Sequence, residues 1–327
     1  MPPTALILRA AGTNCDTEMA RAFTLAGARV SIIHLDALCA DPSPLAAADL
    51  LGFPGGFSFG DDIASGRIFA AKLKSRLWPH LRAAAARSVP MIAVCNGFQI
   101  LVQCGLLPGP IDGHWPETPG PQELSLAPNA SARFHDTWSH IAPAENTVCI
   151  WTKNLLPAAL ALQIPSTDNS NSSSSSLGNA AADSTTNLSS TLSPISTFRP
   201  AAQISPEDLS RHLLMLPVAH GEGRLVAADP AVFTRLAAAG QLALRYAHGD
   251  NPSGSTDAVA GICDARGLIL GLMPHPERYL HWNRHPYWST LRTAHGLTSF
   301  DSIPTPGLQM FKNAVAYVQS NKPELVA

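Results

Sequence analysis

Apolar runs of strand length, separated by polar and helical segments, dominate the first third of this chain. Residues Thr17–Ala26 carry apolar positions at helical spacing, with Asp16 placed to cap a helix and Gly27 placed to end it. Apolar strands that alternate with helices are typical of a parallel sheet buried on both faces. The pattern therefore predicts an α/β fold with a doubly wound, mainly parallel sheet and flanking helices. The runs predicted as strands are Ala5–Leu8, Arg29–Leu35, Asp49–Pro54 and Val89–Val94.

The last third of the chain extends this sheet and closes with a helix predicted over Gln309–Gln319. Between Tyr279 and Pro306 lies a stretch rich in aromatic residues and histidine, which we expect to form a surface subdomain or an interface. The final helix is expected to pack through Phe311, Ala314, Val315 and Val318. The further strands predicted here are Leu213–Val218, Ala243–Tyr246, Val259–Cys263 and Leu268–Met273.

Residues 165–205 differ in composition from the rest of the chain. Serine, threonine and asparagine dominate there, with an unbroken serine run at Ser172–Ser176. Such tracts cannot bury enough apolar surface to offset the entropy lost on ordering. We therefore expect residues 1–327 to form a single domain, with residues 165–205 as a disordered insertion within it.

Composition narrows the class of protein. The chain has 327 residues, 46% of them hydrophobic, so it can bury a sizeable core. It carries 22 basic and 24 acidic residues, a net charge of −2 with no basic stripe, which argues against nucleic-acid binding. No apolar run near the start is long enough for a signal peptide or a membrane span. We expect a cytoplasmic protein that binds neither nucleic acid nor membrane.

The cysteines give no sign of a metal site. Six cysteines, at positions 15, 39, 95, 104, 149 and 263, form no C-x-x-C pair and no cluster with histidine at zinc-ligand spacing. We therefore expect reduced thiols and no bound metal.

One cysteine lies where a predicted strand passes into a predicted helix. Cys95 follows the run Val89–Val94, and apolar residues recur at helical spacing from Phe98 onwards. Gly97 allows a tight turn, and the N-terminus of a helix favours the thiolate form of a cysteine. A nucleophile is built in this way, although a lone cysteine is more often just a buried residue that ends a core strand.

A partner for Cys95 occurs late in the chain. There the apolar run Leu268–Met273 stops at His275, which lies between two prolines that fix the backbone on either side. Glu277 can lie on the same side of an extended segment as the imidazole, because side chains two residues apart share a face. Cys95, His275 and Glu277 can then form a triad.

These residues resemble the class I, or triad, glutamine amidotransferases, which have a flavodoxin-like fold. The stretches Cys95–Gln99 and Pro274–Arg278 carry that resemblance. Further stretches, in the expected order along the chain, resemble the glutaminase subunit or domain of phosphoribosylformylglycinamidine synthase from purine biosynthesis. They are Gly12–Asp16, Pro54–Asp62, Ala219–Arg224 and Phe311–Val315.

The resemblance implies a catalytic role for the triad and for the residues around it. Cys95 would attack the carboxamide of glutamine, which is then released as glutamate and ammonia, while His275 moves protons and Glu277 orients the imidazole. The residues implied in oxyanion and substrate binding are Gly55, Gly56, Asn96 and Gln99.

The stretch after the strand Leu213–Val218 has two interpretations. Glycines on both sides of a carboxylate mark an ordinary tight turn. The family resemblance instead places this stretch at the active-site rim or in contact with a partner subunit. Its residues are His220, Gly221, Glu222, Gly223 and Arg224.

The resemblance also implies a partner. The chain has no G-x-x-x-x-G-K-[ST] loop with which to use ATP, so the synthetase that consumes the ammonia must be another polypeptide. That synthetase subunit would use ATP and Mg²⁺, and a small accessory subunit could complete the complex. The present chain would bind glutamine and need no cofactor of its own.

Two other functions stay open at this point. The chain could be a free-standing triad hydrolase or an amidotransferase of another pathway on the same fold, such as a gamma-glutamyl hydrolase. It could also be a non-catalytic regulatory subunit that keeps the fold and binds a partner. Release of glutamate from glutamine would distinguish an enzyme from a regulatory subunit.

Overall fold

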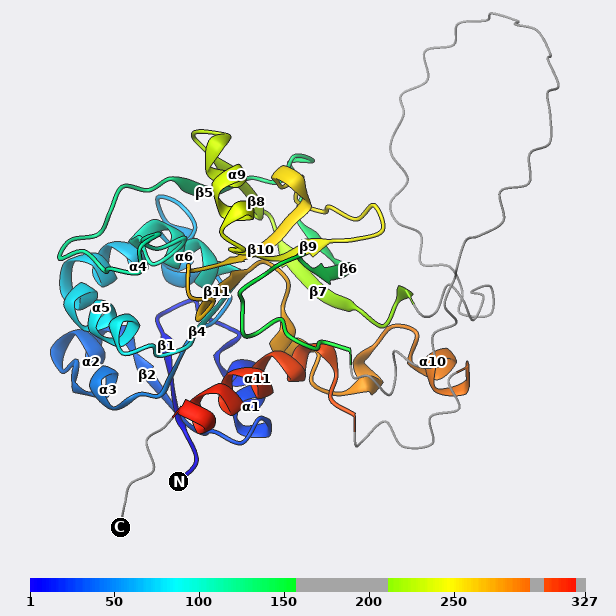
Figure 1. Cartoon of the computed structure of the whole chain (residues 1–327), viewed down its shortest axis with the longest axis horizontal. Helices are drawn as coiled ribbons and strands as arrows, with labels where there is room; N and C mark the ends of the chain where they lie inside the picture. Colours follow the sequence, from blue (N-terminus) through cyan, green and yellow to red (C-terminus); the bar gives the residue numbers. More distant parts are fainter. Residues whose placement is uncertain (157–210, 295–302, 322–327) are drawn as a thin grey trace, which may run out of the picture.

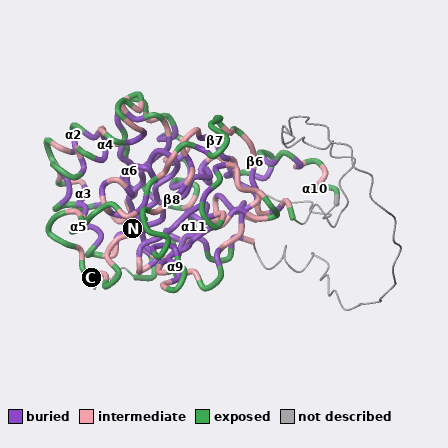
Figure 2. Tube along the Cα trace, turned by 90° about the horizontal axis from the view of Figure 1, so that it is seen from above, coloured by how far each residue is buried: buried purple, intermediate pink, exposed green. Residues whose placement is uncertain are grey.

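The computed structural model describes residues 1–156, 211–294 and 303–321. In this part of the chain a nine-stranded sheet runs in the order β2-β1-β3-β4-β11-β10-β9-β6-β7. Helices lie against its first half (Figure 1). The buried positions follow the strands and the inward sides of the helices (Figure 2).

The first half of the sheet is parallel. Neighbouring strands from β2 to β11 pair in parallel, and the order β2-β1-β3-β4-β11 is that of a flavodoxin-like doubly wound sheet. The predicted α/β class is confirmed. The strands are β1 (Thr4–Arg9), β2 (Arg29–His34), β3 (Leu50–Phe53), β4 (Met91–Val94) and β11 (Ile269–Leu272).

The second half of the sheet is antiparallel. Strand β6 pairs with β9 through Ile141–Pro143 and with β7 through residues 135–140. The other edge of β7 is free of strand partners in the described chain. The strands are β6 (His135–Pro143), β7 (Met215–His220), β9 (Leu242–Tyr246) and β10 (Val259–Cys263), with a separate small sheet of β5 (Leu124–Ala127) and β8 (Arg224–Ala227).

Helices approach the parallel half closely at two glycines of its strands. Gly52 of β3 faces Met19 and Phe23 of α1, and Gly271 of β11 faces Phe98 of α6. Helices α1 and α11 contact each other, as do α4 and α6. The helices are α1 (Asp16–Leu25), α2 (Leu35–Ala40), α3 (Ser43–Ala47), α4 (Arg67–Lys72), α5 (Trp78–Ala86), α6 (Asn96–Cys104), α9 (Ala231–Ala238), α10 (Trp288–Ala294) and α11 (Pro306–Asn321).

One local prediction is wrong. Asp16 is the first residue of α1 and not its cap; Cys15 holds the cap position without a side-chain hydrogen bond, and Asp16 pairs with Arg9 at 3.2 Å. In the aromatic stretch after Tyr279, the side chains of Tyr279, Trp282 and His285 are buried in the chain itself, and its role as a surface subdomain or an interface stays a prediction. Their rings lie against one another and against Trp138 of β6.

The predicted inward stripe of the last helix is buried as expected, at Phe311, Ala314, Val315 and Val318. The predicted insertion, residues 165–205, lies outside the described residues, so that expectation stays a prediction. Across the described ranges, no helix has the length and apolar character needed to cross a bilayer.

Candidate active site

Cys95 lies at a strained corner between β4 and α6. Its backbone angles are φ 52° and ψ −108°, a left-handed conformation that a non-glycine residue adopts only when its surroundings impose it. The next residue but one, Gly97, packs so closely on β3 that an added Cβ would lie 2.0 Å from the Phe53 carbonyl oxygen. Glycine at 97 therefore lets the helix begin directly behind the thiol. The predicted strand-to-helix corner is present.

His275 and Glu277 follow β11 in a short 3₁₀ turn, Pro276–Arg278. His275 Nδ1 and Glu277 Oε1 are 2.6 Å apart, and both side chains are almost fully buried. The carboxylate thus accepts the Nδ1 proton, which leaves Nε2 as the nitrogen that can exchange a proton with a thiol. The expected extended segment is wrong, since the turn brings the two side chains together instead.

The imidazole is charged by its neighbours. Burial alone would disfavour the charge, but the Glu277 carboxylate and the thiols of Cys15 and Cys95 outweigh it and hold the pKa of His275 well above its ordinary value. An imidazolium beside a thiol stabilises the thiolate, which is the reactive form.

The free edge of β7 meets both catalytic candidates. The Pro217 carbonyl accepts a hydrogen bond from the His275 backbone N–H at 2.7 Å, and the Ala219 carbonyl accepts one from the Cys95 thiol at 3.7 Å. Carbonyls two residues apart point from the same edge of a strand. Strand β7 of the antiparallel half therefore helps to position Cys95 and His275, which follow strands of the parallel half.

The glycine loop after β3 lies against the triad. A Cβ added at Gly55 would lie 2.9 Å from His275 Cε1 and 3.4 Å from Cys95 Cβ, so only glycine fits between them. Gly56 has φ 137°, and a Cβ there would lie 2.7 Å from the Gly12 carbonyl oxygen. The N–H of Phe57 is already bound to that Gly12 oxygen at 2.9 Å. Of this loop's N–H groups, that of Phe57 is therefore not free for an oxyanion.

Asn96 and Gln99 of α6 use their side chains to tie the site together. The Asn96 amide nitrogen donates to Asp61 at 3.2 Å and to Gln99 Oε1 at 3.0 Å. The Gln99 amide nitrogen donates to the Glu222 carbonyl at 2.7 Å. These side chains connect the loop after β3 to the turn after β7. The roles of Asn96 and Gln99 in oxyanion and substrate binding stay predictions.

The turn after β7 is held by a buried asparagine. Asn129 accepts from the Gly223 N–H and from His220 Nδ1, both at 3.1 Å, and donates to the His220 carbonyl at 2.8 Å. Burial, and then the nearby His275 and His135, lower the pKa of His220 to about 4, so this ring is neutral. His220 and Gly223 are buried, which leaves Gly221, Glu222 and Arg224 as the members a partner could reach.

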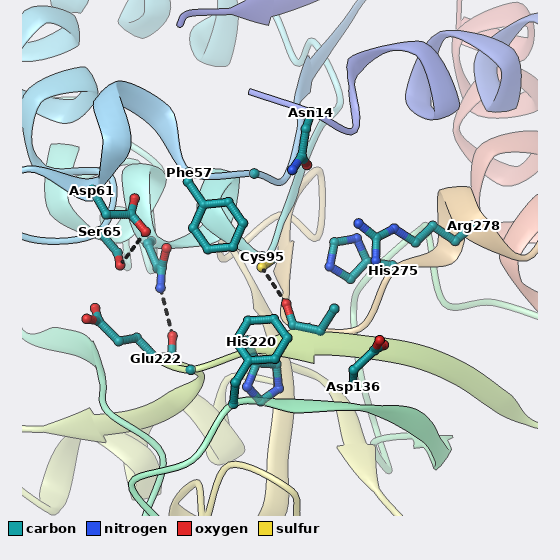
Figure 3. A pocket seen from close by; sticks show the side chains of 15 residues that line it. Asn14, Phe57, Asp61, Ser65, Cys95, Asp136, His220, Glu222, His275 and Arg278 are labelled. Carbon is teal, nitrogen blue, oxygen red and sulfur yellow. Dashed lines mark hydrogen bonds between the residues drawn. The ribbon is translucent and has the colours of Figure 1, made fainter. Parts of the chain in front are cut away.

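A cavity of about 330 Å³ opens beside Cys95. Figure 3 shows His275 and Arg278 on one side of the thiol and Asp61, Ser65 and Glu222 on the other. Gly56 and Gln99 also line the cavity, while Glu277 is not among its lining residues. Its further lining residues are Asn14, Phe57, Phe134, Asp136, Ala219, His220 and Gly221.

Cys15 is a site residue that sequence reasoning missed. Its thiol accepts a hydrogen bond from Arg278 Nη2 at 3.0 Å and lies 4.0 Å from His275 Nδ1. Its place in the Gly12–Asp16 stretch was the only signal. Donor atoms of Cys15, His275 and Glu277 lie within 4.8 Å of one another, close enough for a metal ion. However, the His275–Glu277 hydrogen bond and the Arg278 contact already occupy them.

The chain matches a known protein family over most of its length. A model of the family described as "CobB/CobQ-like glutamine amidotransferase domain" matches residues 2–171 and 189–318 of the chain. The match thus spans both halves of the sheet and every residue of the candidate site.

Curated relatives match over nearly the whole length. The phosphoribosylformylglycinamidine synthase subunit PurQ of Dehalococcoides mccartyi is 32% identical over 324 residues, which cover 96% of this chain and 97% of that protein. The PurQ subunit of Treponema denticola is 31% identical over 299 residues, covering 85% of this chain and 88% of its own.

Among solved structures, a chain in the structure of PurLQS from Thermotoga maritima is similar with a TM-score of 0.57. Its identity is 22%, and the match covers 97% of this chain and 100% of that one. At this identity the likeness bears on the fold alone.

Proposed function

The chain belongs to the CobB/CobQ-like glutamine amidotransferase family, in which it is a PurQ-type glutaminase subunit of phosphoribosylformylglycinamidine synthase, and from this premise we propose that Cys95, His275 and Glu277 hydrolyse glutamine. Its activity serves purine biosynthesis. The observation that supports the assignment is the 2.6 Å contact between Glu277 and His275, with His275 lining the same cavity as a thiol held at a strained strand-to-helix corner.

In the first half of the reaction the Cys95 thiolate attacks the side-chain carbonyl carbon of glutamine. The oxyanion that forms is stabilised by backbone N–H groups, for which we assign Asn96 at the start of α6 and Gly56 of the glycine loop. The His275 imidazolium gives its proton to the leaving nitrogen, so ammonia departs and a thioester remains on Cys95.

In the second half a water molecule attacks the thioester. Neutral His275 takes a proton from that water, and glutamate leaves as the thiolate and the imidazolium are restored. Glu277 keeps the Nδ1 proton in place throughout, so that Nε2 stays directed at the reacting atoms.

The ammonia needs an acceptor that this chain does not make. We propose that the chain works in a complex with a synthetase subunit, which uses ATP and Mg²⁺, and that a small accessory subunit belongs to the same complex. Glutamine hydrolysis by a thiol and an imidazole needs no cofactor in this chain. The predicted cytoplasmic location and the contact of residues 220–224 with the synthetase are part of the same proposal.

The nucleophile is tested by Cys95→Ser in the assembled complex. Glutamine-dependent amidine formation should fall by at least about a thousandfold, because the triad acts as a unit, while activity with added ammonium should persist. Cys15→Ser is the matched control, since this second buried thiol also lies near His275. If Cys15→Ser abolished the activity and Cys95→Ser did not, the triad assignment would be wrong.

A measurement of glutamate release from glutamine distinguishes the competing functions. Glutamate release by the isolated chain at the full rate of the complex would favour a free-standing hydrolase. No glutamate release in any assembly would favour a non-catalytic regulatory subunit.

A further inference from the structure

The proposed reaction uses only one of the two thiols that lie beside His275. Cys15 Sγ is 4.0 Å from His275 Nδ1, yet no step of glutamine hydrolysis needs it. The Cys15 side chain is almost fully buried, and Cys15 is not among the residues that line the cavity. Cys95 does line the cavity, where a small solute can reach its sulfur (Figure 3). The two thiols therefore differ in their access to solutes.

Gly55 lies between Cys15 and Cys95. A Cβ added to this glycine would lie 3.4 Å from Cys15 Sγ and 3.4 Å from Cys95 Cβ, so both cysteines border the same point. Rotation about the Cα–Cβ bond of a cysteine carries its sulfur from one staggered position to another. The glycine loop thus places no side chain of its own between the two cysteines.

Cys15 lies in a polar and positively charged environment. Arg278 Nη2 donates to Cys15 Sγ at 3.0 Å, and the thiol itself donates to Asn14 Oδ1 at 3.2 Å. Burial disfavours the charge of Arg278, but Cys15 and Glu277 outweigh it and hold the pKa of Arg278 above its ordinary value. Cysteines beside an arginine are typically reactive, whereas cysteines in apolar surroundings are inert. Cys104 of α6 is of the second kind, since burial raises its pKa to about 12.

We propose that Cys15 is the resolving thiol of Cys95: once a peroxide has oxidised Cys95, Cys15 closes a disulfide with it. The disulfide stops glutamine hydrolysis, because Cys95 is no longer a nucleophile. It also protects Cys95 from oxidation to sulfinic acid, which is irreversible, whereas an external thiol can reduce the disulfide. The proposal rests on the proposed function in taking Cys95 as the nucleophile.

The oxidation takes place in two steps. The Cys95 thiolate attacks one oxygen of hydrogen peroxide; an S–O bond forms, the O–O bond breaks, and the His275 imidazolium protonates the leaving oxygen, which departs as water. Cys95 is thereby oxidised by two electrons to a sulfenic acid. The Cys15 sulfur then attacks the sulfenic sulfur; the S–S bond forms, the S–O bond breaks, and the departing hydroxide takes the Cys15 proton to give a second water.

The test exposes the full chain, in complex with its synthetase subunit, to hydrogen peroxide that is then removed with catalase. Ammonia release from glutamine is measured before the treatment, after it, and after reduction with dithiothreitol. In the unsubstituted protein the activity should fall by about tenfold or more, and dithiothreitol should restore most of it, because a disulfide can be reduced. Peptide mapping without reductant should show Cys15 joined to Cys95.

Cys15→Ser removes the proposed resolving thiol. Compared with its own activity before treatment, this variant should recover less than about a tenth of its activity with dithiothreitol, because Cys95 is oxidised onwards to sulfinic acid. Dimedone, which traps sulfenic acids, should label Cys95 during peroxide treatment of this variant and should label it much less in the unsubstituted protein.

Cys39→Ser is the matched control, since Cys39 is a partly exposed thiol of α2 outside the cavity lining. It should lose activity with peroxide and regain it with dithiothreitol as the unsubstituted protein does. The peptide map does not depend on activity, so it decides the pairing of Cys95 even if Cys15→Ser impairs folding.

An equal recovery with dithiothreitol in Cys15→Ser and in the unsubstituted protein would overturn the proposal. A glutaminase activity that resists peroxide would overturn it too, as would a map in which oxidised Cys95 is joined to another cysteine or to none. If the untreated complex released no ammonia from glutamine, the proposed function would fail instead, and the peptide map would still decide whether Cys15 and Cys95 form a disulfide.

Discussion

At the scale of single residues, burial has opposite outcomes for two histidines of this site. His220 has no acid beside it, and burial lowers its pKa to about 4. His275 is buried even more completely, yet the carboxylate of Glu277 and the adjacent thiols raise its pKa. The carboxylate and the thiols beside His275 therefore shift its pKa in the direction opposite to that of His220.

The charge on His275 leads to a prediction about how kcat/KM depends on pH. Glu277→Gln removes the attraction that raises the pKa of His275, so the imidazolium should lose its proton at a lower pH. The alkaline limb of the kcat/KM profile should move to lower pH, and the maximum should fall by about tenfold or more because the imidazole is less well oriented. Steady-state ammonia release across the pH range measures both effects.

Glu145→Gln is a suitable control for this change, because Glu145 is exposed and outside the cavity lining. Its profile should overlay that of the unsubstituted protein. An alkaline limb that stayed in place in Glu277→Gln would mean that Glu277 does not set the charge of His275.

At the scale of elements, the local sequence pattern predicted the strand-to-helix corner at Cys95. It did not predict that β7 contacts this corner. Phe98 and the apolar residues that follow it at helical spacing indicated a helix directly after Cys95, and α6 begins at Asn96. The contact of Cys95 with Ala219 joins residues 124 apart in the chain. It depends on the pairing of β6 with β7, which no local pattern reports.

The corner itself can be tested at Gly97. Gly97→Ala places a Cβ 2.0 Å from the Phe53 carbonyl oxygen, so α6 must shift away from β3. Overpacking of this kind should lower the free energy of unfolding by about 1–3 kcal/mol, measured by urea denaturation. It should also slow the alkylation of Cys95, because the helix carries the thiol with it.

Gly120→Ala is the matched control, since a Cβ there meets no atom within 4 Å. It should leave the urea midpoint and the reactivity of Cys95 unchanged. Equal stability of the Gly97 and Gly120 variants would mean that the corner can relax without cost.

At the scale of the whole molecule, the two halves of the sheet position different residues of the candidate site. The parallel half carries Cys95 and His275 at the ends of adjacent strands, β4 and β11, where open α/β sheets bind their ligands. The antiparallel half returns β7 and the turn with Glu222 to the same place. The sequence predicted the first half because its strands are apolar runs. Strands β7, β9 and β10 of the second half were also predicted from apolar runs. Their antiparallel pairing, and strand β6 between β9 and β7, were not predicted, since antiparallel pairing partners leave no comparable signal.

The antiparallel half is also where stability should depend on pH. His285 is buried beside Trp138 and Tyr279, its Nε2 bound to the His212 carbonyl at 2.8 Å and its Nδ1 accepting from the Tyr287 N–H at 3.0 Å. Burial lowers its pKa to about 4, so folded His285 stays neutral between that value and the ordinary value of 6.5. In that window the unfolded chain binds a proton that the folded chain does not, so stability should rise with pH.

The expected contribution of His285 is about 1.4 kcal/mol of unfolding free energy per pH unit within this window, lost progressively as the pH falls from 6.5 towards 4. Urea denaturation at a series of pH values measures the slope. His285→Asn keeps an oxygen that can accept from the Tyr287 N–H but cannot titrate, so its slope should be smaller. His114→Asn, at a side chain 90% exposed, should keep the original slope. If the His285 and His114 variants gave the same slope, protonation of His285 would not destabilise the folded chain. That result would contradict the prediction, because both ring nitrogens of His285 are already hydrogen-bonded.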